Sequence, residues 1–218
     1  MVMGPGAAMS AATARASAGR TWRRVLAPCV LAVAWTTGVA AQPDAVRLAK
    51  AAVAAADNRG QAFAVVDKKK AHVFVFDAQG HLVADSPVLL GLAHGDDSVP
   101  GIGERKMSEI RPDERTTPAG RFASEPGRNM QGEDIVWVDY DAAISMHRVR
   151  ATNKAERRLE RLASPGVADN RISYGCINVP AGFYDAHIRP VLGLRKGVVY
   201  VLPETMPMQA RFGFLARD

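Results

Sequence analysis

Short apolar runs rich in β-branched and aromatic side chains recur along most of the chain. Turn-forming Asp, Asn, Gly and Pro residues separate them, and this alternation is typical of strands joined by tight turns. The pattern predicts strands at residues 62–66, 72–76, 82–91, 120–123, 135–140, 142–147 and 197–202. Residues 94–115 hold no sustained period and are expected to form a loop, at least over the Gly/Pro/Asp-rich stretch 94–103.

Three segments carry a helical pattern instead. Residues 44–56 form an alanine-rich run that Asp44 can cap. Asn153 and Glu156 have the spacing of a capping box at the start of a second helix, which Pro165 ends. A third, short helix is predicted from Pro180 to about His187. We therefore expect a single domain that is mainly β, with inserted helices.

The second predicted helix has a two-sided composition. Leu159 and Leu162 are expected on its inner face, and Arg157, Arg158 and Arg161 are expected to point outward.

Residues 1–41 have the composition of a signal peptide. They contain four arginines and no acidic residue, followed by the apolar run 25–34 and small residues up to Ala41. We expect cleavage after Ala41, and therefore export to the periplasm or cell envelope. An uncleaved anchor is the alternative, although the apolar run is shorter than the roughly 20 residues that span a membrane.

The remaining chain divides into three parts by this interpretation. We expect an N-terminal helical segment at 42–59, a catalytic domain at 60–203 and a C-terminal tail at 204–218. The formal charge of the whole chain is +6, and it falls to +2 without the four arginines of residues 1–41. No stripe of basic residues interleaved with aromatics is present, so a nucleic-acid partner is not expected.

Cysteine use is the most informative count. The chain has two cysteines, and Cys176 is the only one after residue 41. A lone thiol in an oxidising compartment is either buried or used. Gly175 precedes Cys176 and permits a tight backbone path, whose amides can form an oxyanion hole. With a helix predicted to follow, the helix N-terminus would lower the thiol pKa. We predict a nucleophile; a buried, small apolar side chain is the alternative.

A thiol nucleophile requires a base. Among the five histidines, His147 ends a predicted strand and can project into a site, while His94 lies in the glycine-rich loop and can line a cleft. Sequence distance alone does not choose between them. No metal-binding motif or nucleotide-binding signature is present, so neither a metal nor another cofactor is expected.

Three motifs in fixed order resemble the catalytic domain of the L,D-transpeptidase (YkuD-type) family. They are the stretch 117–122 (Thr-Pro-Ala-Gly-Arg-Phe), the strand that ends in His147, and the stretch 173–178 (Ser-Tyr-Gly-Cys-Ile-Asn). The resemblance covers residues 60–203. It implies a β-sandwich-like fold and thioester chemistry on peptidoglycan stem peptides, in cell-wall crosslinking or remodelling. It also implies that carbapenem-type β-lactams are covalent inhibitors.

The resemblance also assigns roles to residues. Cys176 would be the nucleophile and His147 the base, and Gly175 with the Tyr174–Cys176 backbone would supply oxyanion donors. Beyond these assignments, Ser173, Asn178 and Arg150 are candidates for positioning the substrate or supporting the site. For each of these three, a capping or solvated residue is the alternative.

Two positions depart from the family pattern. Tyr174 stands where the family usually has His, and Arg148 follows His147 where the family often has Gly or Ser. These departures keep a second function open, a peptidoglycan hydrolase, that is, an L,D-carboxypeptidase or endopeptidase on the same scaffold. A third alternative is a wall-binding protein that has the fold without activity, although the intact His147–Cys176 pair is evidence against it.

Overall fold

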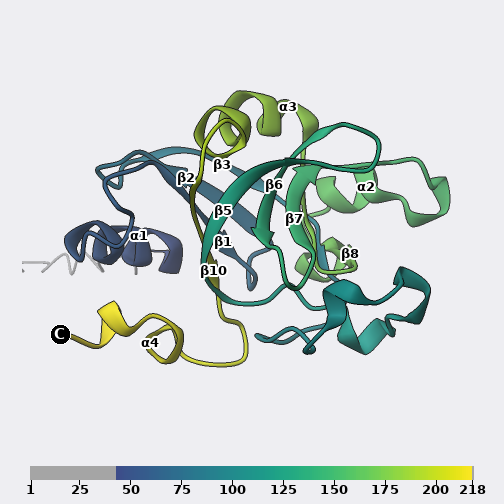
Figure 1. Cartoon of the computed structure of the whole chain (residues 1–218), viewed down its shortest axis with the longest axis horizontal. Helices are drawn as coiled ribbons and strands as arrows, with labels where there is room; N and C mark the ends of the chain where they lie inside the picture. The colour runs from purple at the N-terminus through teal and green to yellow at the C-terminus, as the bar shows by residue number, and fades with distance from the viewer. Residues whose placement is uncertain (1–42, 218) are drawn as a thin grey trace, which may run out of the picture. The chain divides into compact units, whose positions relative to one another are not determined.

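The computed structural model describes residues 43–217 (Figure 1). The predicted signal peptide at 1–41, with Cys29, lies outside the described residues. None of the helices in the described part is both long and apolar enough to cross a membrane.

The strands are β1 (Phe63–Asp67), β2 (His72–Phe76), β3 (Leu82–Pro87), β4 (Leu90–Gly91), β5 (Gly120–Arg128), β6 (Asp134–Asp139), β7 (Ile144–Arg148), β8 (Arg171–Ser173), β9 (Ile177–Val179) and β10 (Gly197–Leu202). The α-helices are α1 (Asp44–Ala54), α2 (Arg158–Ala163), α3 (Ala181–Phe183) and α4 (Met208–Arg211). Short 3-10 turns are η1 (Ile102–Glu104), η2 (Met107–Glu109), η3 (Pro112–Glu114), η4 (Lys154–Glu156), η5 (Val167–Asn170) and η7 (Gly213–Arg217). A π-helical segment, η6 (Tyr184–Gly193), continues α3.

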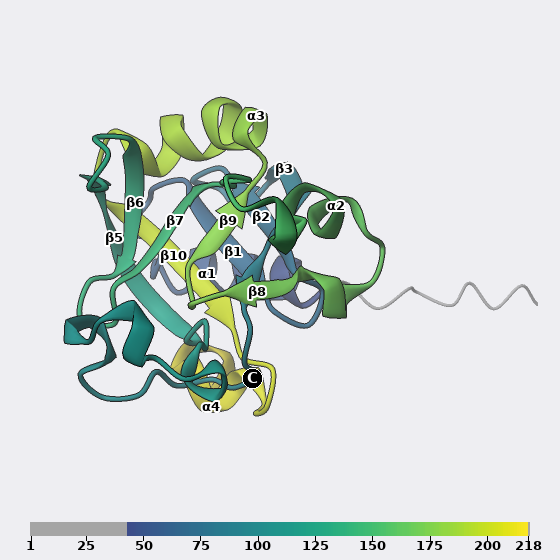
Figure 2. The same ribbon diagram turned by 90° about the vertical axis from the view of Figure 1, so that its right-hand side faces the viewer.

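Eight of the strands form one continuous sheet in the order β3-β2-β1-β10-β5-β6-β7-β9, and β4 pairs with β8 separately. Two pairings in the large sheet are parallel, β1 with β10 and β7 with β9, and the others are antiparallel. Parallel neighbours require a long connection, and the two strands of each parallel pair are indeed distant in sequence. Figure 2 shows β9 beside β7 at one end of the sheet.

The two halves of the large sheet face each other across a shared core. Val73, Val136 and Val199 belong to one buried cluster, although they lie on β2, β6 and β10. Ile188 and Leu192 of η6 close this cluster. One sheet therefore supplies both layers of a sandwich, and the expected fold class, mainly β with inserted helices, is confirmed.

A second apolar cluster covers the outer face of β1, β2 and β10. Leu48 of α1 packs there with Phe63 and Tyr200. Met208 and Phe212, which follow β10, join the same cluster, and α1 and α4 lie on the same side of the strands in Figure 1. Strands β1 and β10 are thus buried on both faces, which explains their continuous apolar sequences.

Two predicted strands, 72–76 and 197–202, coincide with β2 and β10. The predicted strand at 82–91 is divided into β3 and β4. Strands β8 and β9 were missed, because each has only three residues and a loop-like composition around it.

The helix predictions need three corrections. Asp44 does not cap α1; Pro43 holds that position, and Asp44 pairs with Arg47 inside the first turn at 3.1 Å. The helix predicted after Asn153 is interrupted, because Arg157 adopts a left-handed φ of 50° between η4 and α2. This break turns Leu159 outward, 55% exposed, whereas Leu162 is buried as expected.

Candidate active site

The parallel pairing of β7 with β9 assembles the site. The register places His147 beside Asn178 and Met146 beside Ile177. Alternate residues of a strand share a face, so Ser145 and His147 lie opposite the buried Met146. Cys176 immediately precedes β9 and continues the same register beside Ser145. Strand pairing alone therefore brings the thiol, the hydroxyl and the imidazole to one face of the sheet.

The Cys176 thiol is half-buried and has polar neighbours. Its Sγ lies 3.6 Å from Ser145 Oγ and 3.8 Å from the carbonyl oxygen of Ala143. Burial raises the pKa of the thiol, but hydrogen bonding and charge from His147 lower it, as do the amide and hydroxyl of Ser145. The lowering contributions prevail, so the pKa of Cys176 lies below its ordinary value. A larger fraction of such a thiol is ionised at neutral pH, and the thiolate is the nucleophilic form.

A main-chain carbonyl fixes the His147 ring. His147 Nδ1 lies 2.8 Å from the carbonyl oxygen of Arg148. Because a carbonyl can only accept a hydrogen bond, Nδ1 must carry the proton, which leaves Nε2 unprotonated in the neutral ring. His147 therefore presents an acceptor that can take a proton from a thiol.

The side chain of Arg148 has a different role from its carbonyl. Its guanidinium donates to Asp134 and Asp185, both at 3.0 Å, and lies 4.3 Å from the centre of the Tyr184 ring. The pair with Asp185 and that with Asp134 raise the pKa of Arg148 against the effect of burial. Arg148 thus joins β7 to β6 and η6, and its main chain orients the imidazole.

The loop formed by residues 173–176, here called the cysteine loop, is tightly packed. Gly175 has φ +126°, and a Cβ there would lie 2.5 Å from Ile144 Cδ1 and 2.8 Å from the Thr116 carbonyl oxygen. The buried Ser173 hydroxyl donates to the Cys176 carbonyl at 2.7 Å and accepts the Gly175 amide at 3.1 Å. The Gly175 amide therefore donates within the loop. It is not free to face a substrate, although it was predicted to be an oxyanion donor.

Asn178 is fully buried and braces the same loop. Its Nδ2 donates to the Cys176 carbonyl at 3.3 Å, and its Oδ1 accepts from Arg158 at 2.6 Å. The prediction that Arg158 points outward is wrong, because the left-handed turn at Arg157 directs α2 so that this side chain reaches β9. Asn178 and Ser173 hold the cysteine loop from inside, where they cannot contact a bound molecule.

Cys176 does not precede a helix, and this corrects the predicted cause of its activation. Residues 177–179 form β9, and α3 begins only at Ala181. The lowered pKa therefore comes from His147 and Ser145, and not from a helix N-terminus.

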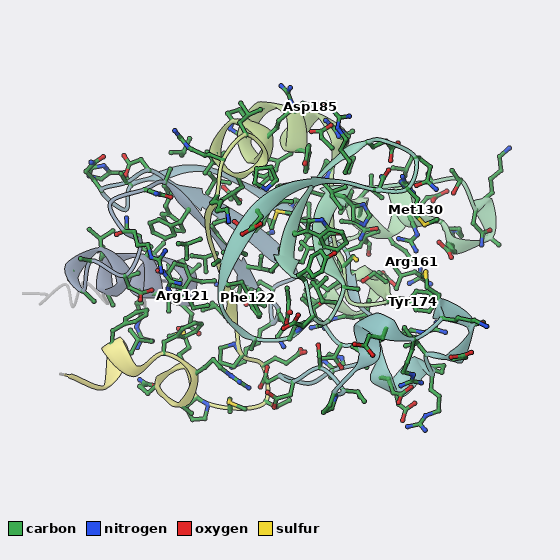
Figure 3. All side chains as sticks on the ribbon, in the orientation of Figure 1. Arg121, Phe122, Met130, Arg161, Tyr174 and Asp185 are labelled. Carbon is green, nitrogen blue, oxygen red and sulfur yellow. The ribbon has the colours of Figure 1, made fainter. Side chains whose placement is uncertain are left out.

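The two remaining predicted site residues, Tyr174 and Arg150, contact different parts of the chain. The half-buried Tyr174 ring lies under the Arg115 guanidinium, whose carbon is 3.8 Å from the ring centre. Figure 3 places Tyr174 near the 3-10 segment that precedes Arg115. Arg150 pairs with Gln131 at 3.0 Å and with Glu133, on the turn between β5 and β6. Arg150 is thereby engaged by the hairpin and not by the cysteine loop.

The alternative base, His94, has another partner. Its Nδ1 bonds to Glu204 at 2.9 Å, and its side chain is 70% exposed. Glu204 in turn pairs with Arg171. This arrangement joins His94 to the charged cluster of Glu204 and Arg171. His147, by contrast, is the histidine that lowers the pKa of Cys176.

Sequence reasoning missed three residues that hold the site. Ser145 lies two positions before His147 on a predicted strand, and this spacing could have identified it. Thr117 belongs to a recognised motif but had no assigned role, and Arg158 was expected to face solvent. Within residues 43–217, no group of three or more His, Cys, Asp or Glu side chains is arranged to hold a metal ion.

Comparison with known protein families gives no matching family model. A comparison with curated proteins likewise gives no match. Several solved structures resemble the chain. A variant of the helical cell shape determining protein Pgp2 from Campylobacter jejuni is 13% identical, with a TM-score of 0.45, covering 76% of this chain and 58% of the other.

Two further solved structures are L,D-transpeptidases. LdtMt1 in complex with imipenem is 16% identical, with a TM-score of 0.36 and coverage of 65% and 58%. An L,D-transpeptidase from Mycobacterium smegmatis is 16% identical, with a TM-score of 0.37 and the same coverage. The chain thus spans less than two thirds of the length of these structures.

Proposed function

We propose that this chain is a cysteine acyltransferase that acts on peptidoglycan stem peptides as an L,D-transpeptidase. The observation that carries the proposal is the Cys176 thiol with its lowered pKa beside His147, whose ring is held in the proton-accepting tautomer. The motif resemblance of residues 117–122 and 173–178 supplies the substrate class.

The reaction we propose has two half-reactions. His147 Nε2 takes the thiol proton, and the Cys176 thiolate attacks the carbonyl carbon of a stem-peptide amide. The C–N bond then breaks, and the leaving amine takes the proton from His147, which leaves a thioester on Cys176. The amine of a second stem attacks the thioester, gives its proton to His147 and restores the thiolate as the new amide forms.

Water in place of the second amine would give hydrolysis, that is, an L,D-carboxypeptidase or endopeptidase. Tyr174 is the departure that keeps this outcome open, because its ring replaces a side chain that could carry a proton. The side chain of Arg148 gives hydrolysis no support, since it is engaged by Asp134 and Asp185.

The proposal extends to place and inhibition. We propose that the protein works in the periplasm or cell envelope, where its substrate is. Carbapenem-type β-lactams should acylate Cys176, because their strained amide presents the same carbonyl and ring opening relieves strain. Intact-mass measurement should show one added drug mass, and Cys176→Ala should show none.

Purified protein incubated with disaccharide-tetrapeptide muropeptides tests the reaction. Mass spectrometry should detect crosslinked dimers with wild type and none with Cys176→Ala or His147→Ala. Shortened stems without dimers would identify a hydrolase instead. Neither product, together with no carbapenem adduct, would contradict the proposal and favour a wall-binding protein.

A further inference from the structure

The motif residue Thr117 makes contacts that link the interior of the protein to the cysteine loop. Thr117 is fully buried. Its hydroxyl donates to the Gly175 carbonyl oxygen at 2.7 Å and accepts the Gly91 amide at 2.9 Å. The hydroxyl thus donates one hydrogen bond and accepts another, and these two partners fix its direction.

The bond to Gly175 determines where the next amide points. The peptide between Gly175 and Cys176 is planar and trans, so its C=O and N–H point to opposite sides. Thr117 holds the Gly175 carbonyl toward the interior, so the Cys176 N–H points away from Thr117. Among the described residues, no hydrogen-bond acceptor is found for this amide, whereas the Gly175 amide is engaged by Ser173.

Thr117 is itself anchored by buried charge. The fully buried Lys68 ammonium donates to the Thr117 carbonyl at 3.0 Å, to Asp96 at 2.8 Å and to the Gly95 carbonyl. Asp96 also accepts the Glu204 amide at 2.7 Å. A buried ammonium with these partners is costly to move, because each displaced contact would leave a buried polar group unpaired. The buried Lys68 ammonium therefore fixes the position of the Thr117 main chain.

We propose that Thr117 is a positioning residue that aims the Cys176 amide as an oxyanion donor. The inference rests on the proposed acyl transfer and goes beyond it, because it assigns the Thr-Pro-x-Gly motif a role in that reaction. When a thiolate adds to a carbonyl, negative charge develops on the carbonyl oxygen, and a pre-aimed amide stabilises it. Thr117 acts through Gly175 and touches no substrate.

Two reactions of the same thiol separate this role from a structural one. Acylation by p-nitrophenyl acetate passes through an oxyanion, and release of p-nitrophenolate follows it. Alkylation by iodoacetamide is a direct displacement at carbon, which develops no oxyanion. Both depend equally on the Cys176 thiolate. An oxyanion-positioning residue should affect the first reaction and spare the second.

The experiment uses full-length protein carrying Cys29→Ser, so that Cys176 is the only thiol. Thr117→Val should slow acylation roughly 10- to 100-fold, as expected for a misplaced oxyanion donor. Its alkylation rate should stay within about twofold of wild type, and the pH midpoint of alkylation within about 0.3 pH units. Acylation of Thr117→Ser, which keeps the hydroxyl, should also stay within about twofold of wild type. Ser124→Ala is the matched control, because Ser124 Oγ is also buried but has no hydrogen-bond partner in the described structure.

Several results would overturn the proposal. One is acylation of Thr117→Val at the wild-type rate, and another is an equal loss of acylation and alkylation. If Thr117→Val does not fold, Thr117→Ala replaces it; failure of both to fold would make Thr117 a purely structural residue. Failure of the proposed function is distinguishable, because it would be an absence of muropeptide products from wild type, whatever the acetate and iodoacetamide rates.

Discussion

Substitution of Gly175 by alanine tests how closely the cysteine loop is packed. The new Cβ would lie 2.5 Å from Ile144 Cδ1 and 2.8 Å from the Thr116 carbonyl oxygen. The isoleucine methyl can rotate away, but the carbonyl belongs to the main chain next to Thr117. The loop must therefore move, or the chain must bear the clash.

The cost can be estimated in two parts. A φ of +126° is strained for alanine, at about 1–3 kcal/mol. Overpacking adds about 1–3 kcal/mol. The sum, about 2–6 kcal/mol, is a large fraction of the roughly 5–15 kcal/mol that stabilises a domain. Gly132→Ala is the matched control, because Gly132 has φ +79° and no atom within 4 Å of the new Cβ. It should bear only the backbone part, about 1–2 kcal/mol.

Urea unfolding of the two variants and wild type gives the comparison. Gly175→Ala should be less stable than Gly132→Ala, and its acylation by p-nitrophenyl acetate should fall, since Cys176 moves with the loop. Equal stabilities of the two variants would refute the reasoning, because the close contacts at Gly175 would then have no energetic effect. A destabilised Gly175→Ala with unchanged acylation would refute the link between loop packing and thiol position.

Three further outcomes are expected. The pH midpoint of Cys176 alkylation should lie below the ordinary thiol value of about 8.5, and His147→Ala should raise it, because it removes the largest contribution that lowers the pKa. Arg148→Ala should cost about 1–2 kcal/mol in urea unfolding through lost pairs and ring contact, yet leave that midpoint within about 0.3 pH units, because only the Arg148 carbonyl orients the imidazole. Burial raises the pKa of Asp96, but hydrogen bonds from Lys68, Thr205 and two amides together lower it by more, so the pKa in the folded state lies below that in the unfolded state. Its contribution is therefore present above about pH 4 and lost as pH falls through the folded pKa, and Asp96→Asn should flatten this acid limb of the stability curve measured by urea unfolding.

Strand positions followed well from the sequence where burial on one or both faces controls composition. β2 and β10 were predicted at their observed bounds, because a continuous run of β-branched and aromatic residues has few other stable arrangements. β8 and β9 were not, since a three-residue strand gives no detectable period. Their pairing depends on partners far away in sequence, namely β4 and β7.

The candidate site was predicted unevenly for the same reason. Cys176 and His147 were selected by residue chemistry and by motif order. The cause of the lowered pKa was assigned wrongly, because it required knowing that Cys176 precedes a strand. Arg158 could not be placed either, since the left-handed backbone at Arg157 that turns it inward leaves no sequence pattern. Contacts set by tertiary structure are invisible to local periodicity.

The parallel pairing of β7 with β9 also makes the reactivity of the thiol conditional on folding. In an unfolded chain, Cys176 has neither Ser145 nor His147 beside it, and its pKa reverts to about 8.5, so it is mostly protonated at neutral pH. The Cys176 thiol of an unfolded molecule is therefore weakly reactive. The chain acquires its reactive group only when β9 is in place beside β7, and below about pH 8.5 the Cys176 thiol should be labelled faster in folded than in unfolded molecules.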